Sequence, residues 1–210
     1  MRERGKGPRM SAPDPRGKGP GDEAWDGGWL RAAHRRPSPN FGPRPAAAVV
    51  DLALIHSISL PPGRYGGPEI EQLFTNRLDG DAHPYFAQLR GLEVSAHFLI
   101  RRDGGLLQFV CCDARAWHAG RSSLAGRDNC NDFSVGIELE GLEDEPFEPA
   151  QYEALAALCA ALAQRYPIAQ IAGHEHVAPG RKNDPGAGFE WHRLAGSLGW
   201  PAGRFPPGLV

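Results

Sequence analysis

Short runs of apolar residues, each about the length of a β-strand, recur through the middle of the chain. Residues 49–56 form the first run, which ends at a histidine. Residues 96–100 and 106–110 form two more, and the Asp103-Gly104 pair between them is a strong turn signal, so we predict a β-hairpin there. Residues 134–140 alternate between apolar and polar positions, which predicts a strand with an apolar face and a face that carries glutamates.

A helix and a last strand complete the pattern. Apolar side chains recur at steps of three and four over residues 152–166, Pro149 suits a first helical turn, and Pro167 ends the helix. Residues 168–172 are typical of a short strand. With a further helix expected near 68–76, the order is strand, long loop, hairpin, strand, helix, strand. This order predicts a mixed α/β (α+β) fold, with a single mixed β-sheet flanked by helices.

Glycine and proline separate the body of the chain from its ends. The 210 residues include 27 glycines and 20 prolines, an excess that excludes a helical bundle or coiled coil for most of the chain. We expect a disordered, basic, Gly/Pro-rich tail at 1–22 and an extended N-terminal segment at 23–47. One folded domain is expected over 48–200, followed by a C-terminal tail at 201–210.

Charge is divided unevenly between the first residues and the remainder. Residues 1–22 contain six Lys/Arg and three Asp/Glu, so the other residues, with 17 Lys/Arg and 22 Asp/Glu, carry a net charge of −5. Nucleic-acid-binding proteins usually present a basic face, so nucleic acid is not an expected partner. No apolar run approaches the roughly 18 residues needed to cross a bilayer, so we expect neither a membrane-spanning helix nor a membrane partner.

The four cysteines and the N-terminus bear on the cellular compartment. No pair of cysteines has the C-x-x-C spacing, so reduced thiols in the core are favoured over a disulfide framework or a zinc cluster. The basic residues at the start of the sequence are not followed by the apolar stretch of a secretory signal. Both features predict a protein of the reducing cytoplasm.

Two histidines, His56 and His174, stand directly after predicted strands, where loops hold functional side chains. The loop at 177–186 contains two prolines and two glycines, which make its path rigid, and it carries Lys182 and Asp184. Two imidazoles and a carboxylate, with a fourth position open to water, form a typical catalytic zinc site, where the metal activates water and polarises a carbonyl. The alternative is a surface loop made rigid by its prolines, in which Asp184 caps a turn.

Two further groups of residues allow more than one interpretation. Glu138 and Glu140 project from one face of a strand, either as a solvated face or with one of them serving as a general base. Trp117 and His118 lie between small residues, which leaves room for a ligand, although a turn explains the small residues equally well. Together these residues favour a metal hydrolase and leave the simpler structural explanations open.

Several segments of the sequence match a known family. From about residue 29 to residue 194 the chain resembles the AmpD-type N-acetylmuramoyl-L-alanine amidases, zinc enzymes of bacterial cell-wall recycling. The matching segments are 57–63, 82–86, 94–97, 99–104, 116–120, 130–134, 136–141 and 178–186. The resemblance implies the mixed-sheet fold of these amidases, which agrees with the predicted order of elements.

The resemblance also implies roles for individual residues. It implies that Zn²⁺ is bound by His56, His174 and Asp184. His176 is the nearest rival ligand, because residues two apart on a strand share a face, and the family motif selects His174. By the same resemblance Glu138, and not Glu140, is the base that activates water. Lys182 is expected to stabilise the oxyanion of the tetrahedral intermediate. Trp117, His118 and Arg127 are expected to line the substrate cleft.

The implied reaction is hydrolysis of the amide between the lactyl group of N-acetylmuramic acid and L-alanine. The expected substrate is a 1,6-anhydro-muropeptide, and the expected protein is a cytoplasmic monomer of peptidoglycan recycling. One alternative is a periplasmic amidase that acts on polymeric peptidoglycan. Another is a module that binds peptidoglycan without cutting it, although such proteins lose a zinc ligand or the base, and this sequence contains all of them.

Overall fold

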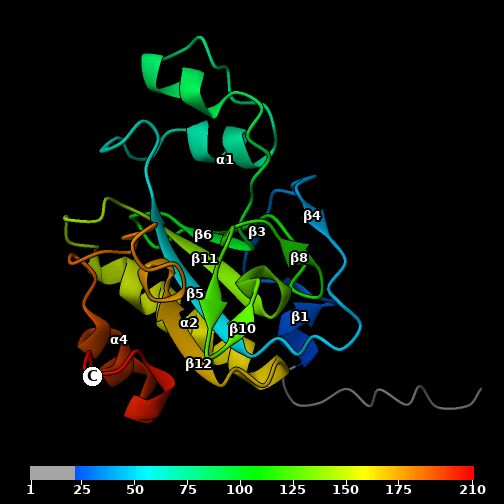
Figure 1. Ribbon diagram of the computed structural model, residues 1–210, viewed down its shortest axis with the longest axis vertical. Helices are drawn as coiled ribbons and strands as arrows, with labels where there is room; N and C mark the ends of the chain where they lie inside the picture. The colour runs from blue at the N-terminus through cyan, green and yellow to red at the C-terminus, as the bar shows by residue number, and fades with distance from the viewer. Residues whose placement is uncertain (1–21) are drawn as a thin grey trace, which may run out of the picture.

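The computed structural model describes residues 22–210, and its centre is a six-stranded sheet in the order β12-β5-β11-β6-β7-β3 (Figure 1). The three inner pairs β12–β5, β5–β11 and β11–β6 are parallel, β6 and β7 form an antiparallel hairpin, and β3 runs parallel to β7 at the edge. The strands are β3 (His34–Arg35), β5 (Leu52–Ile58), β6 (Phe98–Ile100), β7 (Leu106–Gln108), β11 (Ser134–Glu140) and β12 (Gln170–Gly173). The predicted single mixed sheet is therefore confirmed.

Helices and short ribbons surround this sheet. The α-helices of the described residues are α1 (Glu69–Phe74), α2 (Pro149–Arg165), α3 (His174–Val177) and α4 (Trp191–Leu198). Short 3₁₀ helices lie at Asp22–Ala24, Pro84–Leu89, Cys130–Asp132 and Ala202–Arg204. Two-residue strands pair as β1 (Trp25–Asp26) with β2 (Trp29–Leu30), β4 (Phe41–Gly42) with β8 (Arg115–Ala116), and β9 (Ser123–Leu124) with β10 (Arg127–Asp128).

The helices predicted from the sequence are present. α2 begins at Pro149, whose fixed φ suits a first turn, and its apolar face is buried. α1 lies within the stretch predicted near 68–76. The long segment between β5 and β6 contains α1 and the 84–89 turn, and it rises above the sheet in Figure 1.

Side-chain alternation on the two central strands separates the core from the candidate site. Odd-numbered residues of β5 and β11, such as Ile55 and Ile137, pack in one apolar cluster with residues of α2 and α4. Even-numbered residues such as Leu52 and Leu54 face the opposite side, where a second, smaller cluster includes Phe133. Because alternate side chains point to opposite faces, His56 and Glu138 lie on this second side.

Two expectations about the strands need correction. β5 continues to Ile58, so His56 lies inside the strand and not just past its end. The strand β11 is buried at every position, so its glutamates do not form a solvated face. A central parallel strand has cover on both faces, and that cover comes from segments distant in the sequence.

The N-terminal segment at 23–47 folds against the body. β3 extends the edge of the main sheet, and the guanidinium of Arg44 reaches inward, where it donates to the carbonyl oxygens of Cys112, Asn131, Asp132 and Ser134. The expected tail at 1–22 lies outside the described residues except for Asp22, which begins the first 3₁₀ turn. The boundaries at 47/48 and 200/201 stay predictions.

All four cysteines are free thiols. Cys112, Cys130 and Cys159 are buried free thiols, and Cys111 is a half-buried one, as expected for reduced core thiols. None of the helices within residues 22–210 combines the length and the apolar character that crossing a membrane requires.

Candidate active site

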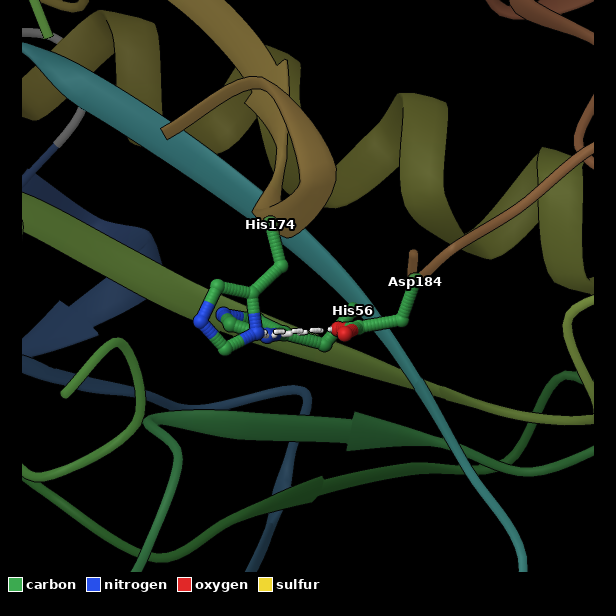
Figure 2. Close-up of side chains that lie close together, drawn as sticks. All are labelled: His56, His174 and Asp184. Atoms are coloured by element: carbon green, nitrogen blue, oxygen red, sulfur yellow. Dashed lines mark hydrogen bonds and ion pairs between the residues drawn. The ribbon is translucent and has the colours of Figure 1, made fainter. Parts of the chain in front are cut away.

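Three side chains from different elements meet inside the protein. His56 lies in β5, His174 is the first residue of α3 directly after β12, and Asp184 lies in the loop that follows α3. The Nδ1 atoms of the two histidines are 3.0 Å apart, and each lies 3.1 Å from Oδ2 of Asp184 (Figure 2). All three side chains are buried. The structure therefore brings together the three residues that the sequence nominated as metal ligands.

The triangle of donor atoms fits a tetrahedral zinc ion. With bonds of about 2.0–2.1 Å, two ligands of tetrahedral zinc lie about 3.3 Å apart, close to the 3.0 and 3.1 Å found here. The Nε2 atom of His174 lies 3.0 Å from the carbonyl oxygen of Ala119, which can only accept, so Nε2 carries the proton and Nδ1 keeps its lone pair. Two nitrogens and one carboxylate oxygen thus form a donor set of the kind found in catalytic zinc sites.

The charges of this cluster also suit a divalent cation. Burial lowers the pKa of His56 to about 4, against the opposing effect of the adjacent Asp184 carboxylate. Burial raises the pKa of Asp184, but its short contacts with the rings of His174 and His56 outweigh burial and hold that pKa below its usual value. At neutral pH the cluster therefore offers an uncharged imidazole at His56 and an ionised carboxylate at Asp184.

Glu138 stands beside the cluster on the neighbouring strand. It pairs in register with His56 across the parallel strands β11 and β5, where adjacent chains lie about 4.8 Å apart. Its side chain lines the same cleft and is 8% exposed, and its Oε2 has no hydrogen-bond partner among residues 22–210. Burial raises its pKa well above the usual value, the charge of Asp184 adds to this, and Lys182 opposes it. A buried carboxylate with a raised pKa and a free oxygen is equipped to accept a proton.

Glu140, two residues further along β11, has a structural role. It is 1% exposed, and its Oε1 accepts hydrogen bonds from the backbone N–H of Gly66 at 2.7 Å and from Arg101 at 2.8 Å. Arg101 in turn pairs with Glu71 of α1. Glu140 therefore holds the segment between β5 and β6 against the sheet, and its oxygens are occupied by structural contacts.

A cleft of about 310 Å³ opens over these groups. Lys182 lines it from the loop between α3 and Asp184, and its side chain is exposed. The lysine lies near enough to Glu138 to act on that residue's pKa. The cleft therefore presents a cation, a buried base and the three candidate ligands on one wall.

Two of the three residues expected to contact substrate line this cleft. Trp117 lines it, and the backbone N–H of Trp117 donates to the hydroxyl of Ser95 at 3.2 Å. His118 also lines the cleft, but both of its ring nitrogens lie against protein atoms: Nδ1 is 2.9 Å from Nε2 of His56, and Nε2 is 3.2 Å from Oγ of Ser134. Trp117 is thus the member of this segment that faces the ligand space.

The structure places Arg127 elsewhere. Its guanidinium donates to both carboxylate oxygens of Asp51, at 2.9 and 3.1 Å, and lies over the ring of Phe133. Asp51 immediately precedes β5, five residues from His56, and Arg127 is not among the residues that line the cleft. Its expected contact with substrate stays a prediction without support from this geometry.

His176, the rival ligand, lies outside the cluster. It belongs to the short helix α3 and not to a strand, so it does not share a face with His174. Its Nδ1 accepts a hydrogen bond from the backbone N–H of Gly173 at 3.0 Å, and its ring packs edge-on against Trp191. Its contacts are structural, and they secure the turn from β12 into α3.

Sequence reasoning missed the apolar part of the cleft lining and a buried residue that supports the His118–Ala119 segment. The segment between β5 and β6 supplies an apolar wall: Leu60, Leu73, Phe74, Tyr85, Leu89, Leu92 and Val94. The sequence signal that could have indicated this part of the lining was the presence of apolar residues in a Gly/Pro-rich loop. Asn131 is buried, and its Oδ1 accepts the backbone N–H groups of His118 and Ala119 at 3.1 and 2.8 Å. No sequence pattern pointed to that role.

Comparisons with known proteins agree on one relationship. Residues 47–187 match the model of a family described as N-acetylmuramoyl-L-alanine amidase. The 1,6-anhydro-N-acetylmuramyl-L-alanine amidase AmpD of Citrobacter freundii is 54% identical over 171 residues, which cover 80% of this chain and 91% of that protein. The protein of the same name from Escherichia coli K12 is 53% identical over 169 residues, which cover 80% and 92%.

Solved structures give the same result. A crystal structure of a selenomethionine derivative of AmpD superposes with a TM-score of 0.80 at 53% identity, covering 82% of this chain and 98% of that one. The amidase AmiD from E. coli, solved with the substrate anhydro-N-acetylmuramic acid-L-Ala-D-γ-Glu-L-Lys, superposes with a TM-score of 0.52 at 30% identity. That match covers 73% of this chain and 60% of AmiD.

Proposed function

The chain belongs to the N-acetylmuramoyl-L-alanine amidase family, and from this premise we propose that it hydrolyses 1,6-anhydro-muropeptides with the help of zinc. The bond cleaved is the amide between N-acetylmuramic acid and L-alanine, a step of peptidoglycan recycling. The observation that carries the proposal is one cleft in which His56, His174 and Asp184 converge beside the unpartnered carboxylate of Glu138. Relatives about half identical over four fifths of this chain are named for the same activity.

The chain's own residues divide the chemistry between them. Nδ1 of His56, Nδ1 of His174 and Oδ2 of Asp184 would hold the zinc ion. When bound there, zinc supplies a Lewis acid that polarises a carbonyl and lowers the pKa of water. The carboxylate of Glu138, which lines the cleft, takes the proton of the attacking water and returns a proton to the leaving amine of L-alanine. The ammonium of Lys182 stabilises the negative charge that develops on the carbonyl oxygen.

The walls of the cleft support a sugar-peptide substrate. Trp117 contributes an aromatic residue to the lining, and the apolar segment with Tyr85 and Leu92 contributes further apolar surface. Such walls exclude water from the scissile amide and strengthen the electrostatic contacts inside the cleft. The groups with assigned roles form a complete set within one chain, so the proposed reaction needs no residue from a second copy. Three buried free thiols support a reducing compartment such as the cytoplasm.

The deciding experiment compares three substrates with one preparation of the protein. The purified chain is incubated with a 1,6-anhydro-muropeptide, with the same muropeptide carrying a reducing sugar, and with intact sacculi. The measured product is the peptide with a free N-terminal L-alanine. We expect fastest release from the anhydro substrate, loss of release after chelation, and recovery with added zinc.

Other outcomes would replace this proposal with a named alternative. Strong release from sacculi alone would identify an amidase of polymeric peptidoglycan. Binding of muropeptide by the zinc-loaded protein, without release of peptide, would identify a binding module. Full activity after exhaustive chelation would remove the role of zinc.

A further inference from the structure

The side chain of His118 makes its closest contacts beneath the proposed zinc site. Its Nδ1 lies 2.9 Å from Nε2 of His56, the ring nitrogen that faces away from the other two ligands. Its Nε2 lies 3.2 Å from Oγ of Ser134, and that hydroxyl lies 2.6 Å from the carbonyl oxygen of Cys130. Three successive hydrogen bonds therefore link the imidazole of His56, the imidazole of His118, the hydroxyl of Ser134 and the backbone carbonyl of Cys130.

The protons of these hydrogen bonds can be placed from the fixed end of the series. A carbonyl oxygen only accepts, so the single proton of the Ser134 hydroxyl points to Cys130. The hydroxyl must then accept from Nε2–H of His118, which leaves the lone pair of His118 Nδ1 to accept from Nε2–H of His56. His56 consequently keeps its own lone pair on Nδ1, the atom that points to His174 and Asp184.

Packing, in addition to hydrogen bonding, fixes the position of the His118 ring. The ring lies directly on Gly136 of β11, where an added Cβ would stand 2.5 to 2.7 Å from three of its atoms, Cγ, Nδ1 and Cδ2. The ring of His118 and that of His56 are nearly perpendicular, with a centroid distance of 5.0 Å and an interplanar angle of 88°. Only glycine at 136 leaves room for this arrangement, so the sheet itself sets the position of the acceptor atom.

The neighbouring residue orients the second histidine ligand. The carbonyl oxygen of Ala119 receives Nε2–H of His174 at 3.0 Å. The amide of Asn131 holds the backbone N–H groups of both His118 and Ala119. One short segment thus determines which nitrogen each imidazole presents to the metal, through a side chain for His56 and through a carbonyl for His174.

We propose that His118 is a positioning residue that fixes the tautomer and the ring orientation of His56, and that it is not primarily a contact for substrate. The proposal rests on the assignment of His56 as a zinc ligand under the proposed function. Partners of this kind fix the orientation of metal-binding histidines and raise their basicity, and their loss typically reduces metal affinity 10- to 100-fold.

The test compares two replacements of nearly the same shape. His118→Asn retains an oxygen that can accept from His56, whereas His118→Leu retains the volume without an acceptor. Zinc affinity is measured with the zinc ion alone, by competition with a coloured chelator, without any substrate. We expect His118→Leu to weaken zinc binding 10- to 100-fold and His118→Asn to bind zinc at least about threefold more tightly than His118→Leu.

Two further variants separate the relay from the cleft. Ser134→Ala removes the hydroxyl that fixes the tautomer of His118, and we expect it to weaken zinc binding severalfold. Trp117→Phe alters the adjacent residue, which lines the cleft but takes no part in the relay, and we expect zinc affinity to change less than about twofold. Thermal melting of each chelated variant measures the stability of the fold separately from zinc binding.

The outcomes distinguish this inference from the proposed function. Unchanged zinc affinity in His118→Leu would overturn the positioning role while the zinc amidase proposal stands. Equal losses in the Asn and Leu variants would show that ring packing, and not the hydrogen bond to His56, is responsible, and would also overturn it. Failure of the unaltered chain to bind zinc would overturn the proposed function and this inference together.

Discussion

Glu138 and Glu140 stand two residues apart on the same strand, and their replacement by glutamine is expected to have opposite consequences. Glu138 lines the cleft, and one of its oxygens has no hydrogen-bond partner among the described residues, whereas Glu140 is bonded to Gly66 and Arg101. Glutamine keeps the shape of either side chain and removes its negative charge. We therefore expect Glu138→Gln to abolish most activity without loss of stability, and Glu140→Gln to lower stability while activity persists.

The size of each effect follows from these contacts. Removing a general base typically slows a reaction by about 10² to 10⁴, which corresponds to roughly 3–5 kcal/mol of activation free energy. Because burial raises the pKa of Glu138, a neutral side chain there should leave the free energy of unfolding unchanged or somewhat higher. Replacing Glu140 takes the charged partner from Arg101, which is 13% exposed, although Glu71 still pairs with it. We expect a loss of about 1–3 kcal/mol in the free energy of unfolding.

The assay measures both quantities on both variants. Release of L-alanyl peptide from a 1,6-anhydro-muropeptide gives the activity, and urea titration of the chelated protein gives the free energy of unfolding. Activity of Glu138→Gln within tenfold of the unaltered chain would refute the assignment of the base. A loss of stability in Glu138→Gln that equals the loss in Glu140→Gln would refute the distinction between a free and an occupied carboxylate.

Three further predictions concern the metal, pH and the N-terminal segment. Asp184→Asn is expected to lose zinc, whereas Glu138→Gln keeps it; equal zinc contents by elemental analysis would contradict the assigned roles. Burial, with the charge of Arg44, lowers the pKa of His97 to about 3, below the 6.5 of an unfolded histidine. The unfolded chain therefore binds a proton that the folded chain excludes, and stability that is present above pH 6.5 is lost as the pH falls toward 3. Between pH 7 and pH 5 the chelated protein should lose about 2 kcal/mol more unfolding free energy than its His97→Asn variant; equal losses in urea titrations would refute this. Arg44→Met should cost about 2–4 kcal/mol, because it leaves buried carbonyl oxygens without donors; a cost below about 1 kcal/mol would show that these bonds contribute little.

The sequence by itself determined the order of elements and the type of sheet. Apolar runs of strand length, a turn signal at Asp103-Gly104 and a 3.6-residue period before Pro167 are local features, and local features survive in the fold. The resemblance to a family nominated His56, His174 and Asp184, and the fold brings them within 3.1 Å of one another. Sequence spacing alone could not have shown that the two histidines are neighbours, because they lie 118 positions apart in the chain.

Only the tertiary structure separated residues that look alike in the sequence. Glu138 and Glu140 share a face of β11, but Glu140 receives hydrogen bonds from Gly66, in the segment between β5 and β6, and from Arg101, directly after β6. His118 was expected to line the substrate cleft, which it does, and Gly136 and Ser134 also place its ring against His56. Periodicity tells which side of a strand a residue occupies, whereas burial and hydrogen-bond partners depend on chain segments that arrive from far away. That information is non-local. The sequence therefore determines the strands and helices that carry this site, whereas the packing of distant segments determines the role of each residue in it.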